Sequence, residues 1–146
     1  MQSKDRYFIP PNQSIEDIPT DNQHLFICGF INHEDEKLIL SPNLFNQLKS
    51  ITIGNGRFKH VREFVVDGLE SLESVKIGRN CFQIRHDERN DCICRITNCP
   101  NLRQLEIGYG SFEDFKSFEI SNVNSLQSIN FGNSCFYYAD FSLKGE

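Results

Sequence analysis

The sequence contains no tryptophan and only one methionine, yet 13 of its 146 residues are phenylalanine. This imbalance indicates that phenylalanine fills one recurring structural position. The sequence also lacks any run close to the roughly 20 apolar residues that a membrane-spanning helix needs, so we expect no membrane segment. No apolar signal-peptide core follows the polar residues 1–6, and we therefore expect a cytoplasmic protein.

Basic residues are in the minority, with 15 Lys and Arg against 20 Asp and Glu, for a net charge of −5. Because nucleic-acid binding depends on Lys and Arg contacts to phosphates, we expect no nucleic-acid partner. Apolar residues make up 38% of the chain, which together with its length is typical of one soluble domain. Such a domain can fold without a metal or a disulfide.

The phenylalanines mark an internal repeat. The phrase Gly-x-x-x-Phe occurs four times, beginning at Gly54, Gly78, Gly108 and Gly132. A Leu-x-x-apolar-x-apolar segment precedes each copy, so the full phrase reads L-x-x-[IVL]-x-[IF]-G-x-x-x-F. The copies are 24, 30 and 24 residues apart. The middle interval therefore contains a six-residue insertion, which falls within residues 85–91.

Each copy predicts one coil of a solenoid. The alternation of Leu105 and Ile107 is typical of a half-buried strand, and we expect Gly108 to have a positive φ at the bend that follows. The alternation of Phe118 and Ile120 indicates a return strand. One coil cannot bury its own apolar face, so the coils must stack. We predict a mostly β solenoid with two short parallel strands per coil. The repeat phenylalanines should stack inside it: Phe58, Phe82, Phe112 and Phe136.

The repeat resembles the BspA-like type of leucine-rich repeat, which is common in long repeat proteins of unicellular eukaryotes. The similarity is clearest in residues 98–112 (NCPNLRQLEIGYGSF) and extends over about residues 38–143. Leucine-rich repeats have periods of 20–29 residues, and the coils here are about 24 residues long. The resemblance implies a leucine-rich-repeat solenoid with a binding role and no particular ligand.

The two ends differ from the repeats. Residues 1–22 form a polar segment that we expect to be loosely ordered or to lie over the first coil. The solenoid should occupy residues 23–146, with a divergent first coil whose strands fall in 24–31 and 38–40. After Leu143 we expect an open strand edge, so that the molecule is part of a longer array or pairs there with a partner. Tyr137 and Tyr138 are alternative candidates for covering that edge.

The six cysteines fit a structural role. Cys81 and Cys135 precede the repeat phenylalanine in coils two steps apart, which is too far for a disulfide. Cys94 and Cys99 take positions that are apolar in other copies, where a thiol acts as a small hydrophobe. We therefore expect six free thiols. A redox pair of Cys92 with Cys94 or Cys99 is a weaker alternative.

Catalytic and metal-binding patterns are weak. The histidines are scattered, and neither a G-x-S-x-G motif nor a Walker loop is present. Four possible zinc ligands lie near one another in the sequence: His86, Cys92, Cys94 and Cys99. They lack the C-x-x-C spacing that zinc sites use, so a zinc site is a minor alternative. We expect a non-catalytic protein that needs no metal or cofactor.

Charges of alternating sign occupy the outward positions around the first strand of each coil. Stacking should align them in two columns: Lys49, Glu73, Arg103 and Gln127 in one, and Thr52, Lys76, Glu106 and Asn130 in the other. Such columns either set the strand register through charge pairs or form a mixed-charge binding surface. The insertion is either a tolerated polar loop or part of the binding face.

These surfaces suggest a protein-interaction scaffold as the function, because a solenoid offers an extended surface to a protein partner. The alternative is a structural fragment of a repeat array that self-associates through its open C-terminal edge. The candidate binding residues lie in the two columns and the insertion: Lys49, Thr52, Glu73, Lys76, Arg85, Asp87, Glu88, Arg89, Arg103 and Glu106.

Overall fold

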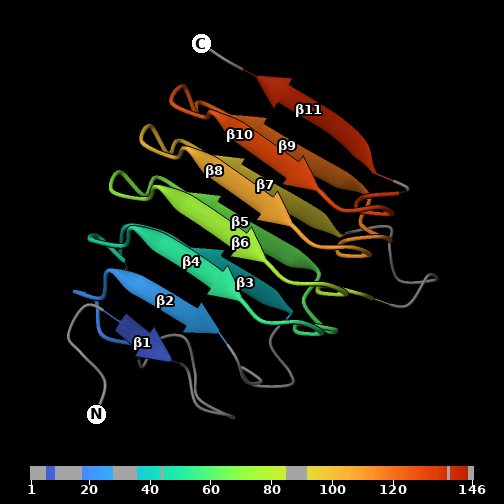
Figure 1. The fold of residues 1–146 in the computed structure, drawn as a ribbon, viewed down its shortest axis with the longest axis horizontal. Helices are drawn as coiled ribbons and strands as arrows, with labels where there is room; N and C mark the ends of the chain where they lie inside the picture. The colour runs from blue at the N-terminus through green and yellow to red at the C-terminus, as the bar shows by residue number, and fades with distance from the viewer. Residues whose placement is uncertain are drawn as a thin grey trace.

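A computed structural model describes residues 6–8, 18–27, 36–43, 45–84, 92–137 and 139–144. In this part of the chain the fold is a β-solenoid of about four turns, with strands and no helix (Figure 1). The coils repeat about every 26 residues on average, because the insertion lengthens one of the 24-residue intervals. Nothing among the described residues forms a helix able to cross a membrane.

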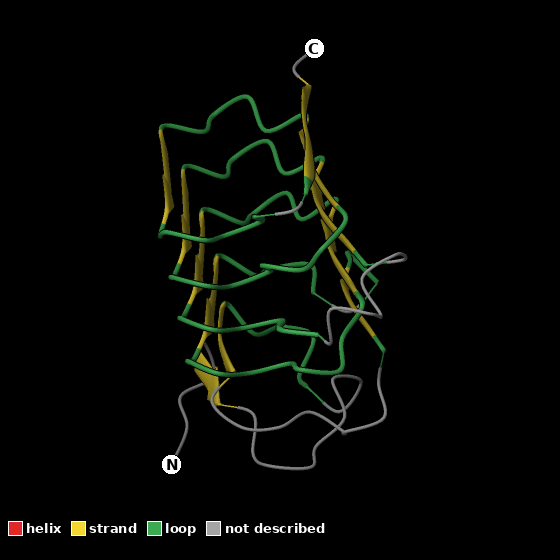
Figure 2. Cartoon of the chain, turned by 90° about the vertical axis from the view of Figure 1, so that its right-hand side faces the viewer, coloured by secondary structure: helices red, strands yellow, loops and turns green. Residues whose placement is uncertain are grey.

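The strands form two parallel sheets. The front sheet pairs, in this order, β1 (Arg6–Phe8), β2 (His24–Ile27), β4 (Ser50–Ile53), β6 (Ser74–Ile77), β8 (Gln104–Ile107) and β10 (Ser128–Phe131). The return sheet pairs β3 (Lys37–Leu40), β5 (Glu63–Asp67), β7 (Ile93–Thr97), β9 (Ser117–Ser121) and β11 (Asp140–Lys144). Figure 2 shows the two sheets on opposite sides of the stack. Each coil therefore contributes one strand to each sheet, as the sequence predicts.

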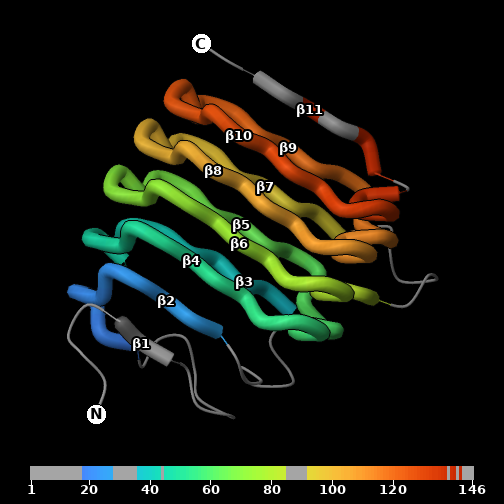
Figure 3. The backbone as a smooth tube through the Cα atoms, viewed as in Figure 1, coloured from blue at the N-terminus to red at the C-terminus, as the bar shows by residue number. Residues whose placement is uncertain are grey.

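The strand register follows the repeat. Ile51, Val75 and Leu105 lie opposite one another in adjacent front strands, and Ile129 continues the row. The insertion does not shift this register, since β6 pairs directly with β8 and β5 with β7. Figure 3 shows the coils following the same path through the stack. The divergent first coil keeps the pattern, because β2 pairs with β4 and β3 with β5.

The repeat phenylalanines form the predicted internal stack. The ring centroids of Phe58 and Phe82 are 5.0 Å apart, those of Phe82 and Phe112 are 4.4 Å apart, and those of Phe112 and Phe136 are 4.8 Å apart. Phe115 adds an edge-on contact to Phe112 at 4.9 Å. All five side chains are buried. The stack and its edge-on neighbour account for five of the 13 phenylalanines in the sequence.

The expected positive φ at the repeat glycine is wrong. Left-handed backbone occurs instead two and four residues later, at Gly56, Asn80, Gly110 and Ser134, and at Phe58, Phe82, Phe112 and Phe136. The glycine is needed for space. A Cβ on Gly108 would lie 2.7 Å from the backbone carbon of Gly78, and one on Gly132 would lie 2.6 Å from the nitrogen of Tyr109. Successive backbones pass too close here for any side chain.

The two ends of the stack are different. At one end β1 pairs with β2, and Ile18 is buried with only 4% of its surface exposed. These residues of the N-terminal segment therefore lie against the first coil. At the other end Ile129 is 45% exposed, although Leu105 in the same row is fully buried. Tyr137 is 67% exposed, and Tyr138 lies outside the described residues.

Candidate functional site

The outer face of the front sheet carries the predicted column that begins at Thr52. Thr52, Lys76 and Glu106 lie side by side in β4, β6 and β8, and Asn130 follows in β10. Lys76 and Glu106 are exposed, while Thr52 is partly buried. The alternation of inward and outward side chains along each strand produces this placement. Four side chains from successive coils thus form one row across the sheet.

The other predicted column, which begins at Lys49, lies just before the same strands. The backbone N–H of Glu73 donates to the carbonyl of Lys49 at 2.7 Å, and that of Arg103 donates to the carbonyl of Glu73 at 2.8 Å. The N–H of Gln127 donates to the carbonyl of Arg103 at 2.9 Å. These bonds extend the sheet ladder by one residue and hold the column in line. The structure therefore brings six of the candidate binding residues together on one face.

The charges on the two sheets differ in their pairing. On the return sheet Lys37 forms an ion pair with Glu63 at 3.5 Å, and the Arg95 Nε forms one with Glu119 at 2.7 Å. Within the described residues, none of the charged side chains of the two front columns forms an ion pair with another. These are Lys49, Glu73, Lys76, Arg103 and Glu106. The charge pairing expected within the front columns is therefore absent among the described residues, and the pairs between coils occur on the return sheet instead.

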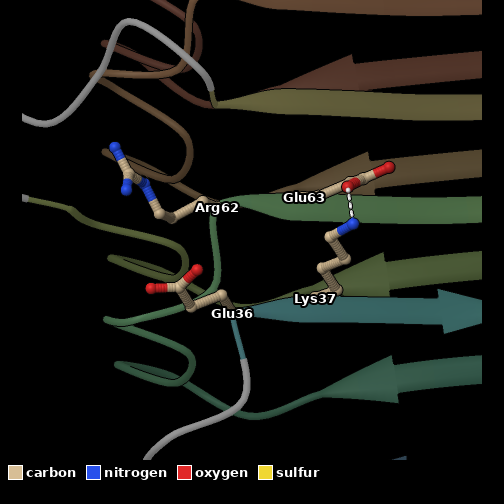
Figure 4. A pocket seen from close by; sticks show the side chains of 4 residues that line it. All are labelled: Glu36, Lys37, Arg62 and Glu63. Atoms are coloured by element: carbon tan, nitrogen blue, oxygen red, sulfur yellow. Dashed lines mark ion pairs between the residues drawn. The ribbon is translucent and has the colours of Figure 1, made fainter.

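Figure 4 shows the paired charges of the return sheet at the start of β3 and β5. Lys37 points toward Glu63, and Glu36 and Arg62 lie just before these two strands. The four side chains line a hollow of about 190 Å³. Because opposite charges from neighbouring coils face each other here, this hollow serves the stacking of the coils.

The corner after the return strands carries a polar ladder that the sequence analysis missed. The Asn122 amide donates to Asn98 Oδ1 at 2.8 Å, and the Asn98 amide donates to Asp67 Oδ1 at 2.9 Å. Thr97 Oγ1 also donates to Asp67, at 2.7 Å. Left-handed backbone at Gly68, Asn98 and Asn122 forms the corner. Gly and Asn both tolerate this conformation. The recurrence of Gly or Asn at this position in successive coils is therefore the sequence signal from which the corner could be predicted.

This ladder borders a shallow groove of about 340 Å³ that crosses three coils. Its lining is polar apart from one proline and one glycine: Gly68, Glu70, Asn98, Pro100, Asn122 and Asn124. The Asn101 amide ties the corner to the carbonyl of Glu70 at 2.6 Å. The polar side chains of this corner hydrogen-bond mainly to the corners of neighbouring coils, so their role is to hold the stacked coils together.

In three coils the residue before the repeat phenylalanine carries a hydroxyl or a thiol. This group donates a hydrogen bond to a backbone carbonyl of the preceding coil. Cys81 Sγ donates to the carbonyl of Gly54 at 3.1 Å, and Ser111 Oγ donates to that of Gly78 at 2.7 Å. Cys135 Sγ donates to the carbonyl of Gly108 at 2.9 Å. The carbonyls belong to the glycines whose backbones pass close to the next coil. This position therefore needs a small donor, which Ser and Cys both supply.

The described cysteines are free thiols, four of them buried. Burial raises the pKa of the Cys99 thiol to about 11 and holds the pKa of Cys94 well above its usual value. Because only the thiolate is a good nucleophile or metal ligand, these side chains act as core residues near neutral pH. The described part of the chain brings no three His, Cys, Asp or Glu side chains together as a metal site.

Three parts of the predicted sites lie outside the described residues. They are the insertion with Arg85, Asp87, Glu88 and Arg89, the possible zinc donor His86, and the sixth cysteine, Cys28. No protein-family model, curated protein or solved structure matches the chain.

Proposed function

We propose that this chain is a non-catalytic protein-interaction scaffold that binds a partner protein through the outer face of the front sheet. The observation that supports this proposal is the contrast between the two sheets. Four charged side chains of the return sheet form two ion pairs between coils, Lys37–Glu63 and Arg95–Glu119, whereas the front columns hold charges without intramolecular ion pairs in the described residues. A partner with complementary charges can use the front charges without first breaking such pairs.

The arrangement of these charges fits a partner protein. One coil presents Glu73 followed by Lys76, and the next presents Arg103 followed by Glu106, so the sign reverses between neighbours. Complementary charge patterns of this kind give association its specificity and speed. A flat face that spans several coils also suits an extended protein surface better than a small molecule.

We further propose that the coils are leucine-rich repeats of the BspA-like type. The leucine that opens the repeat phrase is buried at Leu48, Leu72 and Leu102. The 24-residue interval and the buried apolar pair of each front strand support the same assignment. Buried free thiols are typical of proteins from reducing compartments, which supports a cytoplasmic location.

The test is an affinity capture with the purified chain, read by mass spectrometry and repeated with two charge variants. The first variant combines Lys76→Glu and Arg103→Glu on the front sheet. The matched control combines Lys59→Glu and Lys116→Glu, which are exposed residues away from that face and change the net charge equally. We expect the wild type and the control to retain a protein partner that the front variant loses.

Two results would contradict the proposal. If both variants lose the partner equally, the binding depends on net charge and not on the front sheet. If the wild type captures no protein that the front variant fails to capture, the front sheet does not bind a partner. Circular dichroism of each variant establishes that it remains folded.

A further inference from the structure

We propose that two copies of this chain pair face to face through the outer face of the front sheet, about a two-fold axis parallel to the strands and midway between β6 and β8. The proposal rests on the function proposed above, because it identifies a second copy of the chain as the protein that this face binds. The side chains that support it come from two coils in the middle of the solenoid: Glu73, Lys76, Arg79, Arg103, Glu106 and Tyr109.

A third column of side chains continues the two columns already described, three residues further along the chain. Arg79 and Tyr109 occupy it just after β6 and β8, and both are exposed, Tyr109 by 52%. The backbone holds them in line, because the N–H of Asn80 donates to the carbonyl of Tyr109 in the next coil at 2.8 Å. In the flanking coils the column contains Asn55 and Asn133, which carry no charge. The coils of β6 and β8 therefore present three side chains each.

These six side chains make the face complementary to itself. The coil of β6 presents one acidic residue followed by two basic residues: Glu73, Lys76 and Arg79. The coil of β8 presents a basic, an acidic and an aromatic residue: Arg103, Glu106 and Tyr109. A two-fold axis between the two coils places each side chain opposite its column neighbour in the second copy. The facing pairs, each formed twice, are two of opposite charge and one of a cation with an aromatic ring: Glu73 with Arg103, Lys76 with Glu106, and Arg79 with Tyr109.

The third column determines the direction of the axis. A two-fold axis along the stack, through the column of Lys76, would bring Lys76 against its own equivalent and Glu106 against its own. An axis along the stack between the other two columns would pair their four charges but leave Arg79 and Tyr109 outside the contact. Of the three arrangements, the axis parallel to the strands is the one that pairs all six side chains and opposes no like charges.

The flanking coils add no repulsion to this arrangement. The same rotation places the coil of β4 opposite the coil of β10 in the second copy, and at most one member of each facing pair is charged. These pairs are Lys49 with Gln127, Thr52 with Asn130, and Asn55 with Asn133. In the outward row between the charged columns, Ser74 of β6 faces Gln104 of β8. Polar side chains that can exchange hydrogen bonds thus surround the central pairs.

The size of the face indicates a weak, reversible pair. Three columns across four coils span roughly 20 Å by 15 Å, at about 3.3 Å per residue and 4.8 Å per strand. This area is below the roughly 800 Å² per partner of a standard interface, so we expect a dissociation constant on the order of tens of micromolar.

Sedimentation of the 146-residue chain from about 10 μM to 1 mM tests the pairing. We expect the mass to rise from 16.9 kDa toward twice that value, and high salt to reverse the rise. Lys76→Glu with Arg103→Glu makes the four central charges acidic, and Glu73→Lys with Glu106→Lys makes them basic. Either variant alone should raise the dissociation constant about tenfold or more, because like charges then face each other.

An equal mixture of the two variants should pair again with an affinity near that of the wild type, because every acidic side chain among the four then faces a basic one. This recovery would also show that both variants are folded. The control, Lys59→Glu with Lys116→Glu, has the net charge of the acidic variant but changes exposed residues away from the face, and it should pair like the wild type. A mixture that stays monomeric while the wild type pairs would overturn the contact through this face.

A thiol cross-link tests the axis. Lys49→Cys mixed with Gln127→Cys should be joined by a short bismaleimide, because the axis places these positions opposite each other in sheets packed about 10 Å apart. Lys49→Cys mixed with Thr52→Cys is the control, with the same native thiols, and an axis along the stack would bring these two positions together instead. Preferential cross-linking of the control mixture overturns the proposed axis.

Self-pairing and the proposed function fail on different results. A wild type that stays monomeric over the whole concentration range overturns self-pairing. The affinity capture then decides the function separately, since another protein retained through the front sheet supports it and an empty capture contradicts it. If the chain pairs with itself, the capture should retain an isotope-labelled, untagged copy of the chain.

Discussion

The rings of Phe82 and Phe112 lie 4.4 Å apart and only 10° from parallel, although both residues have left-handed backbone, with φ of 56° and 58°. That conformation costs a bulky residue on the order of 1–3 kcal/mol. Ring burial and stacking must offset this cost, since each aromatic pair contributes about 0.5–1.5 kcal/mol beyond its burial. The left-handed backbone turns each ring back into the interior, where it meets its equivalents in the neighbouring coils.

Phe112→Ala should lower the free energy of unfolding by about 3–5 kcal/mol, because it removes a fully buried ring from the middle of the stack. Urea denaturation measures the loss. Phe112→Leu is the control, since it retains most of the buried volume and loses only the ring contacts. A loss below about 1 kcal/mol for the alanine variant would contradict a central role for the stack.

Two glycine variants separate the need for space from the need for left-handed backbone. Gly78→Ala should destabilise by about 2 kcal/mol or more, because its Cβ would meet Asn55 and lie 2.8 Å from that residue's backbone nitrogen. Gly56→Ala should cost only about 1 kcal/mol, because its φ is +71° but nothing lies within 4 Å of the added carbon. Equal thermal stability of the two variants would argue against the close backbone approach.

Ser111→Ala should destabilise by about 1–3 kcal/mol. The Ser111 hydroxyl donates to the carbonyl of Gly78 and accepts the N–H of Cys81 at 3.0 Å, and both partners are in the coil before it. Ser111→Cys should cost less, because cysteine fills the same position in the neighbouring coils. Chemical denaturation that ranked the two variants in the opposite order would show that volume, and not the hydrogen bonds, determines this position.

Alkylation should find six free thiols in the unfolded chain. In the folded chain Cys135 should react first among the described cysteines, since it alone is partly exposed. Peptide mapping after brief labelling identifies the site, and Cys135→Ser provides the control. Fewer than six alkyl groups under denaturing, non-reducing conditions would reveal a disulfide, and early labelling of Cys99 would contradict its burial.

The buried thiols also make stability depend on pH. The Cys99 thiol loses its proton near pH 9 in the unfolded chain but near pH 11 in the folded one, so unfolding releases protons between these values. The free energy of unfolding should therefore fall as pH rises from about 9 to 11. Cys99→Val, which copies Val123 of the next coil, should make this fall shallower. An unchanged slope would assign the effect to other groups.

The repeat made much of this fold predictable from the sequence. Four aligned copies show which positions are equivalent, and alternation shows which of them face inward. The stack of Phe58 through Phe136 and the row of Lys76 beside Glu106 both follow from these two facts. The exposed row at Ile129 follows as well, since the last coil lacks a covering neighbour among the described residues.

Relations between coils were harder to predict. The role of Gly108 depends on its distance from Gly78 in the previous coil, and a one-coil pattern contains no such distance. The corner ladder is hard to predict from the sequence because Gly68 and Asn98 share a backbone conformation and not a side-chain shape. The pairing of Arg95 with Glu119 depends on rotamers, which a column of charges does not determine.

The parallel ladders of both sheets give the molecule a directional mechanical response. Every strand pairing joins one coil to the next, so the interstrand hydrogen bonds run along the axis of the stack. A force that pulls the two ends apart along this axis would therefore peel off coils one after another. Each released coil of 24 residues would add roughly 80 Å of extended chain. Stretched in this way, the protein would lengthen one coil at a time, with a longer step at the 30-residue interval, and would dissipate work at each step.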